Sequence, residues 1–142
     1  MASRTLPVVL VLHDDNQILR QISKMTSELA ELIPSRRAVH ANVIMDQAAR
    51  IDLIMVGRCG DGVSPLDVLS HARARQKQAR TILLADPSDL STPIEALHSG
   101  LVDHVLNPPL REREIRAILA LPLRPVVNPN AIATMSPPKR TM

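Results

Sequence analysis

Two groups of side chains in this sequence could do chemistry, and each follows a short apolar run. Asp14 and Asp15 come directly after the run at residues 7–12, and adjacent carboxylates supply the oxygen ligands that Mg²⁺ prefers. Without a third acid beside them, the two would bind such a cation weakly. The structural alternative is that one acid caps the following helix and the other is solvated. The pair therefore predicts either a weak metal site or a helix cap.

The second group lies in the loop after the apolar run at residues 51–56. Gly57 ends this run, and Cys59 and Asp61 follow within a glycine-containing loop. Cys59 would be reactive if it were exposed, since Arg58 beside it favours the thiolate, although an incidental thiol is the simpler interpretation. The loop glycines lack the order of a nucleotide-binding motif. Five histidines are scattered without zinc-ligand spacing, at His13, His40, His71, His98 and His104.

Composition limits the class of protein. A chain of 142 residues with 45% hydrophobic content predicts one domain, and the absence of Phe, Tyr and Trp argues against a platform that stacks on single-stranded nucleic acid. Of 17 basic residues, three lie beyond Leu121, so residues 1–121 carry 14 basic side chains against 14 acidic ones. Because residues 1–121 carry no net charge, we do not expect this domain to bind nucleic acid. A single cysteine and no apolar run of about 20 residues indicate a cytoplasmic protein without membrane insertion.

Apolar runs and amphipathic stretches alternate along the chain, and they predict five strands, each followed by a helix. Strands are expected at residues 7–12, 38–43, 53–56, 81–85 and 104–106. Helices are expected at residues 18–33, 46–50, 65–80, 91–98 and 112–121. Asp15 or Asn16 would cap the first helix, Pro34 and Ser35 would end it, Ser91 or Thr92 would cap the fourth, and Gly100 would end that one.

This alternation predicts an α/β fold, (βα)5, with a parallel sheet covered on both faces in three layers. The domain should occupy residues 1–121. Residues 122–142 contain five prolines and no helical period, so they are expected to form a flexible, basic tail or a linker.

The order of motifs resembles the response-regulator receiver family, the phosphorylatable domains of bacterial two-component signalling, over about residues 7–121. The resemblance implies a flavodoxin-like, doubly wound sheet with strand order 2-1-3-4-5. Asp14 and Asp15 look like the family's acidic pair, and Ile51 to Gly57 looks like the strand that delivers its phosphoacceptor. Pro108 after Asn107 resembles the family's Lys-Pro bond, which is commonly cis.

The same resemblance implies that the signature chemistry has been lost. Gly57 stands in the phosphoacceptor position, Ala85 in the hydroxyl position, Asn107 in the lysine position and His104 in that of the aromatic switch residue. Without the carboxylate, the hydroxyl and the ammonium group, phosphoryl transfer loses its nucleophile and most of its electrostatic stabilisation. The expectation is therefore a degenerate pseudo-receiver that is not an enzyme and needs no cofactor beyond weakly bound Mg²⁺.

Three functions follow as hypotheses. The first is phosphorylation-independent binding of another protein, or a homodimer, through the fourth helix, fifth strand and fifth helix. The resemblance places this surface at Ile94, Leu97, His104, Arg111, Arg113 and Arg116. The second is a phosphorelay receiver that uses Asp61 or Asp86 as a substitute acceptor. The third is a domain that senses a small ligand at the strand-end crevice.

Overall fold

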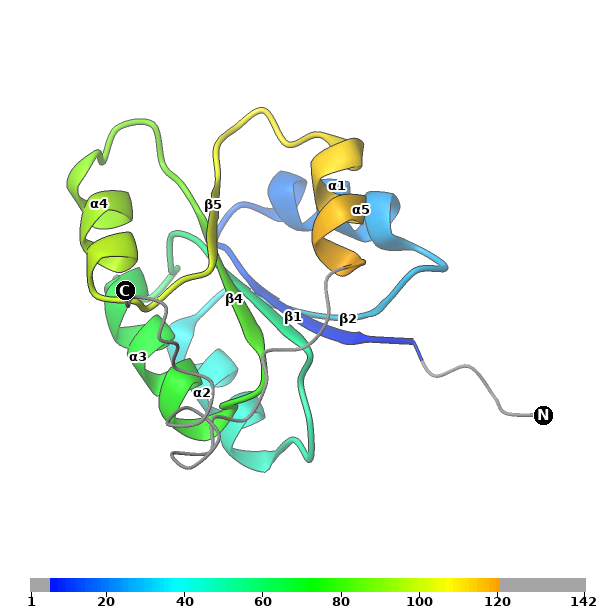
Figure 1. Cartoon of the computed structure of the whole chain (residues 1–142), viewed down its shortest axis with the longest axis horizontal. Coiled ribbons are helices and arrows are strands. Elements are labelled where there is room, and N and C mark those ends of the chain that lie inside the picture. Colours follow the sequence, from blue (N-terminus) through cyan, green and yellow to red (C-terminus); the bar gives the residue numbers. More distant parts are fainter. Residues whose placement is uncertain (1–5, 121–142) are drawn as a thin grey trace, which may run out of the picture.

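The computed structural model describes residues 6–120, which form one five-stranded parallel sheet with helices on both faces (Figure 1). The strands are β1 (Val8–Leu12), β2 (Glu31–Ser35), β3 (Leu53–Val56), β4 (Arg80–Leu84) and β5 (His104–Leu106). The helices are α1 (Asn16–Thr26), α2 (Ala38–Gln47), α3 (Pro65–Arg75), α4 (Ser91–His98) and α5 (Glu112–Leu119). The strand order β2-β1-β3-β4-β5 confirms the predicted fold class. The expected tail at residues 122–142 lies outside the described residues.

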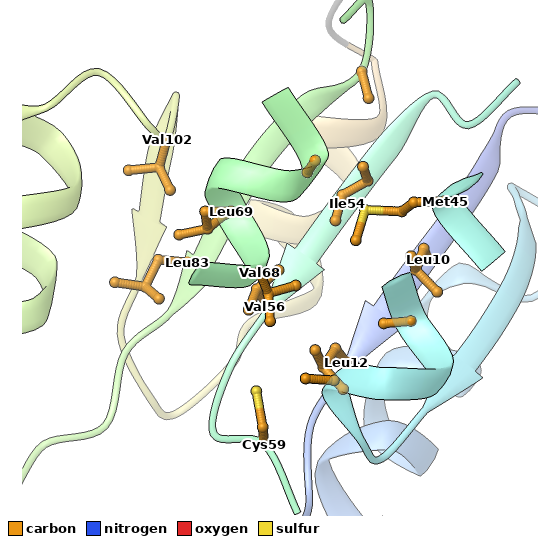
Figure 2. Packing of buried hydrophobic residues seen from close by; sticks show 14 of the residues in the cluster. Leu10, Leu12, Met45, Ile54, Val56, Cys59, Val68, Leu69, Leu83 and Val102 are labelled. Carbon is orange, nitrogen blue, oxygen red and sulfur yellow. The ribbon is translucent and has the colours of Figure 1, made fainter. Parts of the chain in front are cut away.

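Alternate side chains of the central strands enter two separate cores. Leu10 and Leu12 point to the face covered by α2, α3 and α4, whereas Val9 and Val11 point to the face covered by α1 and α5. Figure 2 shows the first of these cores, where Met45 of α2 and Val68 and Leu69 of α3 pack on the sheet. Because both faces are covered, β1 and β3 are wholly apolar and β4 is apolar from Ile82 onward, which is why these strands can be recognised in the sequence.

The prediction of one long helix through Ile33 was wrong. Helix α1 ends at Thr26, Glu28 adopts a left-handed backbone with φ of 77°, and the chain returns as β2 beside β1. Parallel pairing with β1 outweighs the helical spacing of the apolar residues here. Pro34, predicted to stop the helix, lies inside β2, where a proline is tolerated because β2 is an edge strand.

The predicted strand at residues 38–43 and helix at residues 46–50 were also wrong. One helix, α2, spans this region, and its buried residues Ala38, Ala41 and Met45 recur at three- and four-residue steps. The β-branched residues that favoured a strand, Val39 and Val43, lie on the exposed side of α2. The buried alanines carry the helical period, but they are weak hydrophobic signals.

Helix termini agree with prediction in part. Asp15 caps α1, Pro65 begins α3, and Gly100, with φ of 72°, follows the end of α4. Ser91 and Thr92 do not cap α4, because the carboxylate of Asp89 accepts hydrogen bonds from both of their amides. The other ends shift by a few residues: α3 ends at Arg75, α5 ends at Leu119, and residue 80 opens β4.

None of the helices in residues 6–120 is long and apolar enough to cross a membrane.

Candidate functional site

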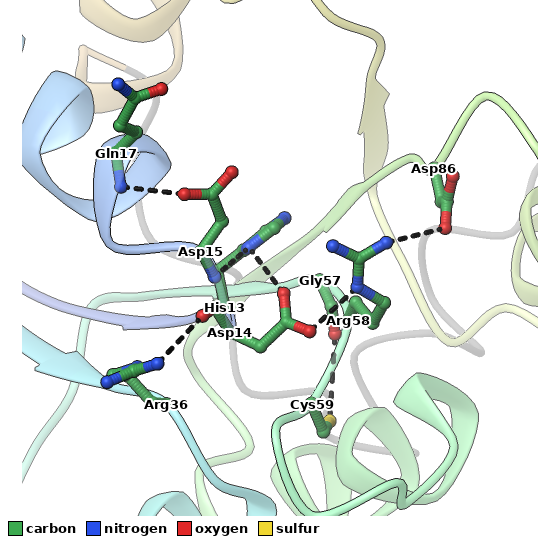
Figure 3. A network of polar contacts seen from close by, with 9 residues as sticks. All are labelled: His13, Asp14, Asp15, Gln17, Arg36, Gly57, Arg58, Cys59 and Asp86. Atoms are coloured by element: carbon green, nitrogen blue, oxygen red, sulfur yellow. Dashed lines mark hydrogen bonds and ion pairs between the residues drawn. The ribbon is translucent and has the colours of Figure 1, made fainter.

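The candidate site is built by three loops that leave the carboxyl ends of β1, β3 and β4 (Figure 3). The β1 and β3 loops are held together by main-chain hydrogen bonds. The Gly57 amide donates to the Leu12 carbonyl at 2.8 Å, and the Asp14 amide donates to the Arg58 carbonyl at 2.8 Å. These bonds fix the acidic residues after β1 against the residues after β3. Sites of α/β proteins commonly lie at this edge of the sheet.

The imidazole of His13 occupies the space that a side chain at position 57 would need. A Cβ atom on Gly57 would lie only 2.4 Å from Cδ2 of His13, well inside van der Waals contact. Any residue other than glycine at this position therefore requires the ring to move. The His13 ring, which comes from the β1 loop, therefore fills the space into which a side chain at position 57 would project.

His13 is a neutral residue in this position. Its Nδ1 accepts a hydrogen bond from the Asp15 amide at 3.0 Å, which places the ring proton on Nε2. Burial lowers the pKa of His13, and the nearby Asp14 carboxylate opposes that shift only in part. His13 Nδ1 also lies 3.4 Å from Asp14 Oδ1. Because Nδ1 carries no proton, this contact is not a hydrogen bond.

Arg58 brings a positive charge between acids from two different loops. Its Nε donates to Asp14 Oδ2 at 2.8 Å, and its Nη1 approaches Asp86 Oδ2 at 3.4 Å (Figure 3). The hydrogen bond to Asp14 raises the pKa of Arg58. The guanidinium thus links the β1 loop to the β4–α4 loop and partly neutralises both carboxylates.

The two acids after β1 do not converge on one point. The Asp15 carboxylate accepts from the Gln17 amide at 2.8 Å and caps α1, whereas the Asp14 carboxylate turns toward Arg58 (Figure 3). The helix-cap interpretation therefore holds for Asp15. Across residues 6–120 there is no cluster of three or more His, Cys, Asp or Glu side chains arranged to hold a metal ion.

The sequence is similar to that of a known regulatory protein. No family model matches this chain. A curated relative, the acid tolerance regulatory protein ActR of Sinorhizobium medicae (strain WSM419), is 28% identical over 130 residues, which is 85% of this chain and 64% of that protein. The chain thus spans less than two thirds of that relative's length.

Two solved structures resemble the whole domain. A CheY-like response regulator receiver domain protein from Methanospirillum hungatei JF-1 matches with a TM-score of 0.72 and 17% identity, over 81% of this chain and 91% of that chain. An adenylate cyclase from Rhodopirellula baltica matches with a TM-score of 0.73 and 24% identity, over 80% and 84% of the two chains. This chain has the receiver fold. At such identities the likeness concerns the arrangement of elements.

Within the receiver fold, a small crevice of about 160 Å³ lies at this edge of the sheet. Of the proposed degenerate positions, Ala85 lines it, together with His13, Arg58, Asp86 and Pro108. Asn107 is exposed and is not among the lining residues. The cis peptide bond of this segment joins Pro108 to Pro109, one residue later than the bond that the Lys-Pro resemblance indicated. Ala85 and Pro108 are therefore brought together with the β1 and β3 loops, whereas Asn107 is not.

Asp61 has a structural role that the sequence did not reveal. Its two carboxylate oxygens accept hydrogen bonds from the Ala38 amide at 2.9 Å and the Val39 amide at 3.1 Å, so it caps α2 from the β3–α3 loop. The bond from Ala38 is the main reason that the pKa of Asp61 is lowered. Gly60 permits this docking, because its amide donates to the Arg36 carbonyl at 2.7 Å and a Cβ there would lie 2.8 Å from that oxygen.

Asp86 is held within the β4–α4 loop. One of its oxygens accepts from the amide of Ser88 at 2.9 Å and from the hydroxyl of Ser88 at 2.8 Å, and the other faces Arg58. The hydrogen bond from the Ser88 amide is the main cause of its lowered pKa. Neither proposed substitute acceptor is a free carboxylate directed at Gly57.

Cys59 belongs to the loop after β3, and its side chain is buried. Its Sγ lies 3.7 Å from the Gly57 carbonyl oxygen. Burial raises the pKa of the Cys59 thiol to about 11. The thiol is therefore protonated and shielded at neutral pH, as the incidental interpretation holds. The histidines do not gather either; His71, for example, contacts Asp46 at 2.7 Å between α3 and α2.

The predicted partner surface coincides with uncovered apolar side chains on α4. Ile94 is 68% exposed and Leu97 is 53% exposed, and Leu90, which precedes the helix, is 76% exposed. Leu90 was not predicted from the sequence, although it lies four residues before Ile94, which lies three before Leu97, and this spacing places all three on one helical stripe. The remaining predicted residues are also exposed, namely His104, Arg111, Arg113 and Arg116. Arg116 already pairs with Glu112 on α5, with an Nη2 to Oε2 distance of 2.7 Å.

Proposed function

We propose that this chain is a receiver-like domain of two-component-type signalling that acts by binding another protein without being phosphorylated. The observation that carries the proposal is the position of His13, whose ring fills the space beside Gly57 where a phosphoacceptor side chain would have to stand. The name of the curated relative, a regulatory protein, supports a role in signalling.

Phosphoryl transfer is poorly supported by the groups around Gly57. There is no carboxylate at position 57 and no hydroxyl at position 85. Arg58 already neutralises part of the charge on Asp14, which reduces the attraction of that carboxylate for a divalent cation. Asp61 and Asp86 are engaged in hydrogen bonds of their own. We therefore propose a non-enzymatic role in the cytoplasm, although one structural neighbour is named an adenylate cyclase.

The surface that we propose for the partner combines the α4 stripe with cationic residues of α5. Leu90, Ile94 and Leu97 would supply the apolar centre. Arg111, Arg113 and Arg116 would supply a charged rim. Large apolar side chains gathered on one helix face are a common feature of interaction sites. His104 at the β5 edge of the sheet lies between these two elements in the chain order and completes the proposed surface.

The test is partner binding with and without a phosphodonor. Immobilised wild-type protein is used to capture partners from the source cell in the presence or absence of acetyl phosphate and Mg²⁺, and sedimentation equilibrium measures self-association under the same two conditions. The proposal predicts the same partner, or the same homodimer, at the same affinity in both conditions. Binding that requires the phosphodonor would contradict it.

Reversal of the rim charges separates the proposed surface from an ordinary solvated helix. The Arg113→Glu, Arg116→Glu variant should lose partner binding while its helical circular dichroism stays unchanged. The Arg20→Glu, Lys24→Glu variant on α1 is the matched control, since it makes the same change of charge elsewhere. Unimpaired binding by the α5 variant would place the interface on another face.

A further inference from the structure

A groove unrelated to the strand-end crevice lies at the β2 edge of the sheet. Its volume is about 860 Å³, and it runs between α1, the end of β2 and the first two turns of α2. A second hollow of about 420 Å³ continues it along α1 and shares Asn16, Leu19 and Pro34 with it. The larger hollow alone has the size of a typical small-ligand site.

The floor of the groove is apolar. No further strand covers the outer edge of β2, so core side chains reach the surface there. Leu19 belongs to the core under α1 and α5, and Ile44 packs against the core under α2 and α3, so both cores reach the surface at this edge. Val43, which is 47% exposed, adds a further apolar side chain from α2. Pro34 has no amide hydrogen, which makes this edge unsuitable for an added strand.

The rim of the groove is cationic. Arg36 and Arg37 line the larger hollow and Arg20 lines the smaller one, and none of the described lining residues is acidic. Arg36 donates to the Asp14 carbonyl at 3.3 Å, which positions its guanidinium at the mouth while leaving other N–H donors available. The amino terminus of α2 is already occupied by the Asp61 carboxylate, so an anion here would be bound by the arginine side chains.

We propose that this groove binds an amphipathic anion, namely a carboxylate with an unbranched hydrocarbon chain. The chain would lie on Leu19, Ile44 and Val43, and the carboxylate would accept hydrogen bonds from Arg36 and Arg37. The apolar floor and the arginine side chains that line the rim together select this chemistry over a neutral or cationic ligand. The proposal is independent of the partner surface on α4 and of the state of the Gly57 site.

The test is a titration of ¹⁵N-labelled full-length protein, followed by backbone amide shifts. Decanoate is compared with nonyltrimethylammonium, which has the same nonyl chain and the opposite charge. Decanoate should produce saturable shifts at the amides of Leu19, Arg37 and Val43, and it should bind about tenfold more tightly than the cation, as expected for charged hydrogen bonds.

Two variants locate the binding. Arg36→Gln, Arg37→Gln should weaken decanoate binding by about tenfold, because both charged donors are lost. Arg113→Gln, Arg116→Gln removes the same charge from α5 and should leave the affinity unchanged. The proposal is overturned by equal affinities for the two ligands, by shifts that map to α4, by an undiminished affinity of the groove variant, or by no saturable shift.

Discussion

The loops at the carboxyl ends of β1 and β3 are closed by their own side chains, whereas α4 leaves three large apolar side chains uncovered. At the loops, His13 fills the space beside Gly57 and Arg58 ties Asp14 to the β4–α4 loop. On α4, Leu90, Ile94 and Leu97 have more than half of their surface exposed. The same scaffold therefore leaves an apolar surface uncovered on α4 and has no free space beside Gly57. This contrast is the physical basis for proposing binding without phosphorylation.

The largest effect should come from placing charge on the uncovered helix. Ile94→Asp, Leu97→Asp should weaken binding of the partner by about 30-fold or more, since truncating an interface hot spot costs about 2 kcal/mol. Both side chains are exposed, so the thermal unfolding midpoint should change little. Binding is measured by titration with the captured partner.

The matched control for that variant is Val39→Asp, Val43→Asp on α2, which alters another pair of exposed apolar residues on one helix. It should leave the partner affinity unchanged. Equal losses in the two variants would mean that general surface hydrophobicity, and not the α4 stripe, drives the association.

A double-mutant cycle tests whether His13 closes the site. Gly57→Ala should destabilise the wild-type protein by about 1–3 kcal/mol, the usual cost of overpacking, because the new Cβ meets the His13 ring. In a His13→Ala background the same change should be neutral or slightly stabilising, since alanine restricts the unfolded chain. Urea unfolding followed by circular dichroism gives both values. Additive effects of the two substitutions would contradict the proposed contact.

Removal of the Asp61 carboxylate should loosen the start of α2. Asp61→Ala should speed hydrogen exchange at the Ala38 and Val39 amides, and Asp61→Asn, which keeps one acceptor, should do so less. Because hydrogen bonds lower the pKa of Asp61, its contribution is present above the unfolded pKa of about 3.9 and is lost as the pH falls through the lower folded pKa. The difference in unfolding midpoint between wild type and Asp61→Ala should therefore shrink in acid. A pH-independent difference would assign Asp61 another role.

The smallest effect concerns Cys59. With a pKa of about 11, roughly one thiol in a thousand is ionised at pH 8, and burial shields it further. A maleimide should therefore leave the folded protein unlabelled at pH 8 and label it rapidly in urea. Rapid labelling of the folded state would show that the site loop opens in the folded protein, which would contradict a closed site.

The parts of the fold that the sequence predicted are those with a strong local signal. Strands β1, β3 and β4 are buried on both faces, so they appear as continuous apolar runs. Strand β2 has only partly buried apolar residues and a proline, and α2 exposes its valines and buries alanines, so the local signal pointed the wrong way. Pairing with β1 and capping by Asp61 decide these two elements, and both are contacts between distant residues.

In the candidate site, the residues that follow the strands could be predicted from the sequence, but the contacts between the loops could not. The proposed loss of a carboxylate at Gly57 and of a hydroxyl at Ala85 was inferred from the place of these residues after two recognisable strands. The contact of Arg58 with Asp14 spans 44 positions, and the His13 ring reaches Gly57 only because the two loops are hydrogen-bonded together. No local pattern encodes such contacts. Leu90 is different, because its spacing to Ile94 and Leu97 was visible in the sequence.

The central claim, that the closed site cannot take up a phosphoryl group, is tested most directly by intact mass spectrometry. The protein is incubated with acetyl phosphate and Mg²⁺ beside a receiver domain that is known to be phosphorylated, and each sample is measured before and after hydroxylamine. We predict no adduct on this chain while the control is modified. A hydroxylamine-labile phosphoryl adduct, on Asp61, Asp86 or an acid after β1, would contradict the account and return the chain to phosphorylated signalling.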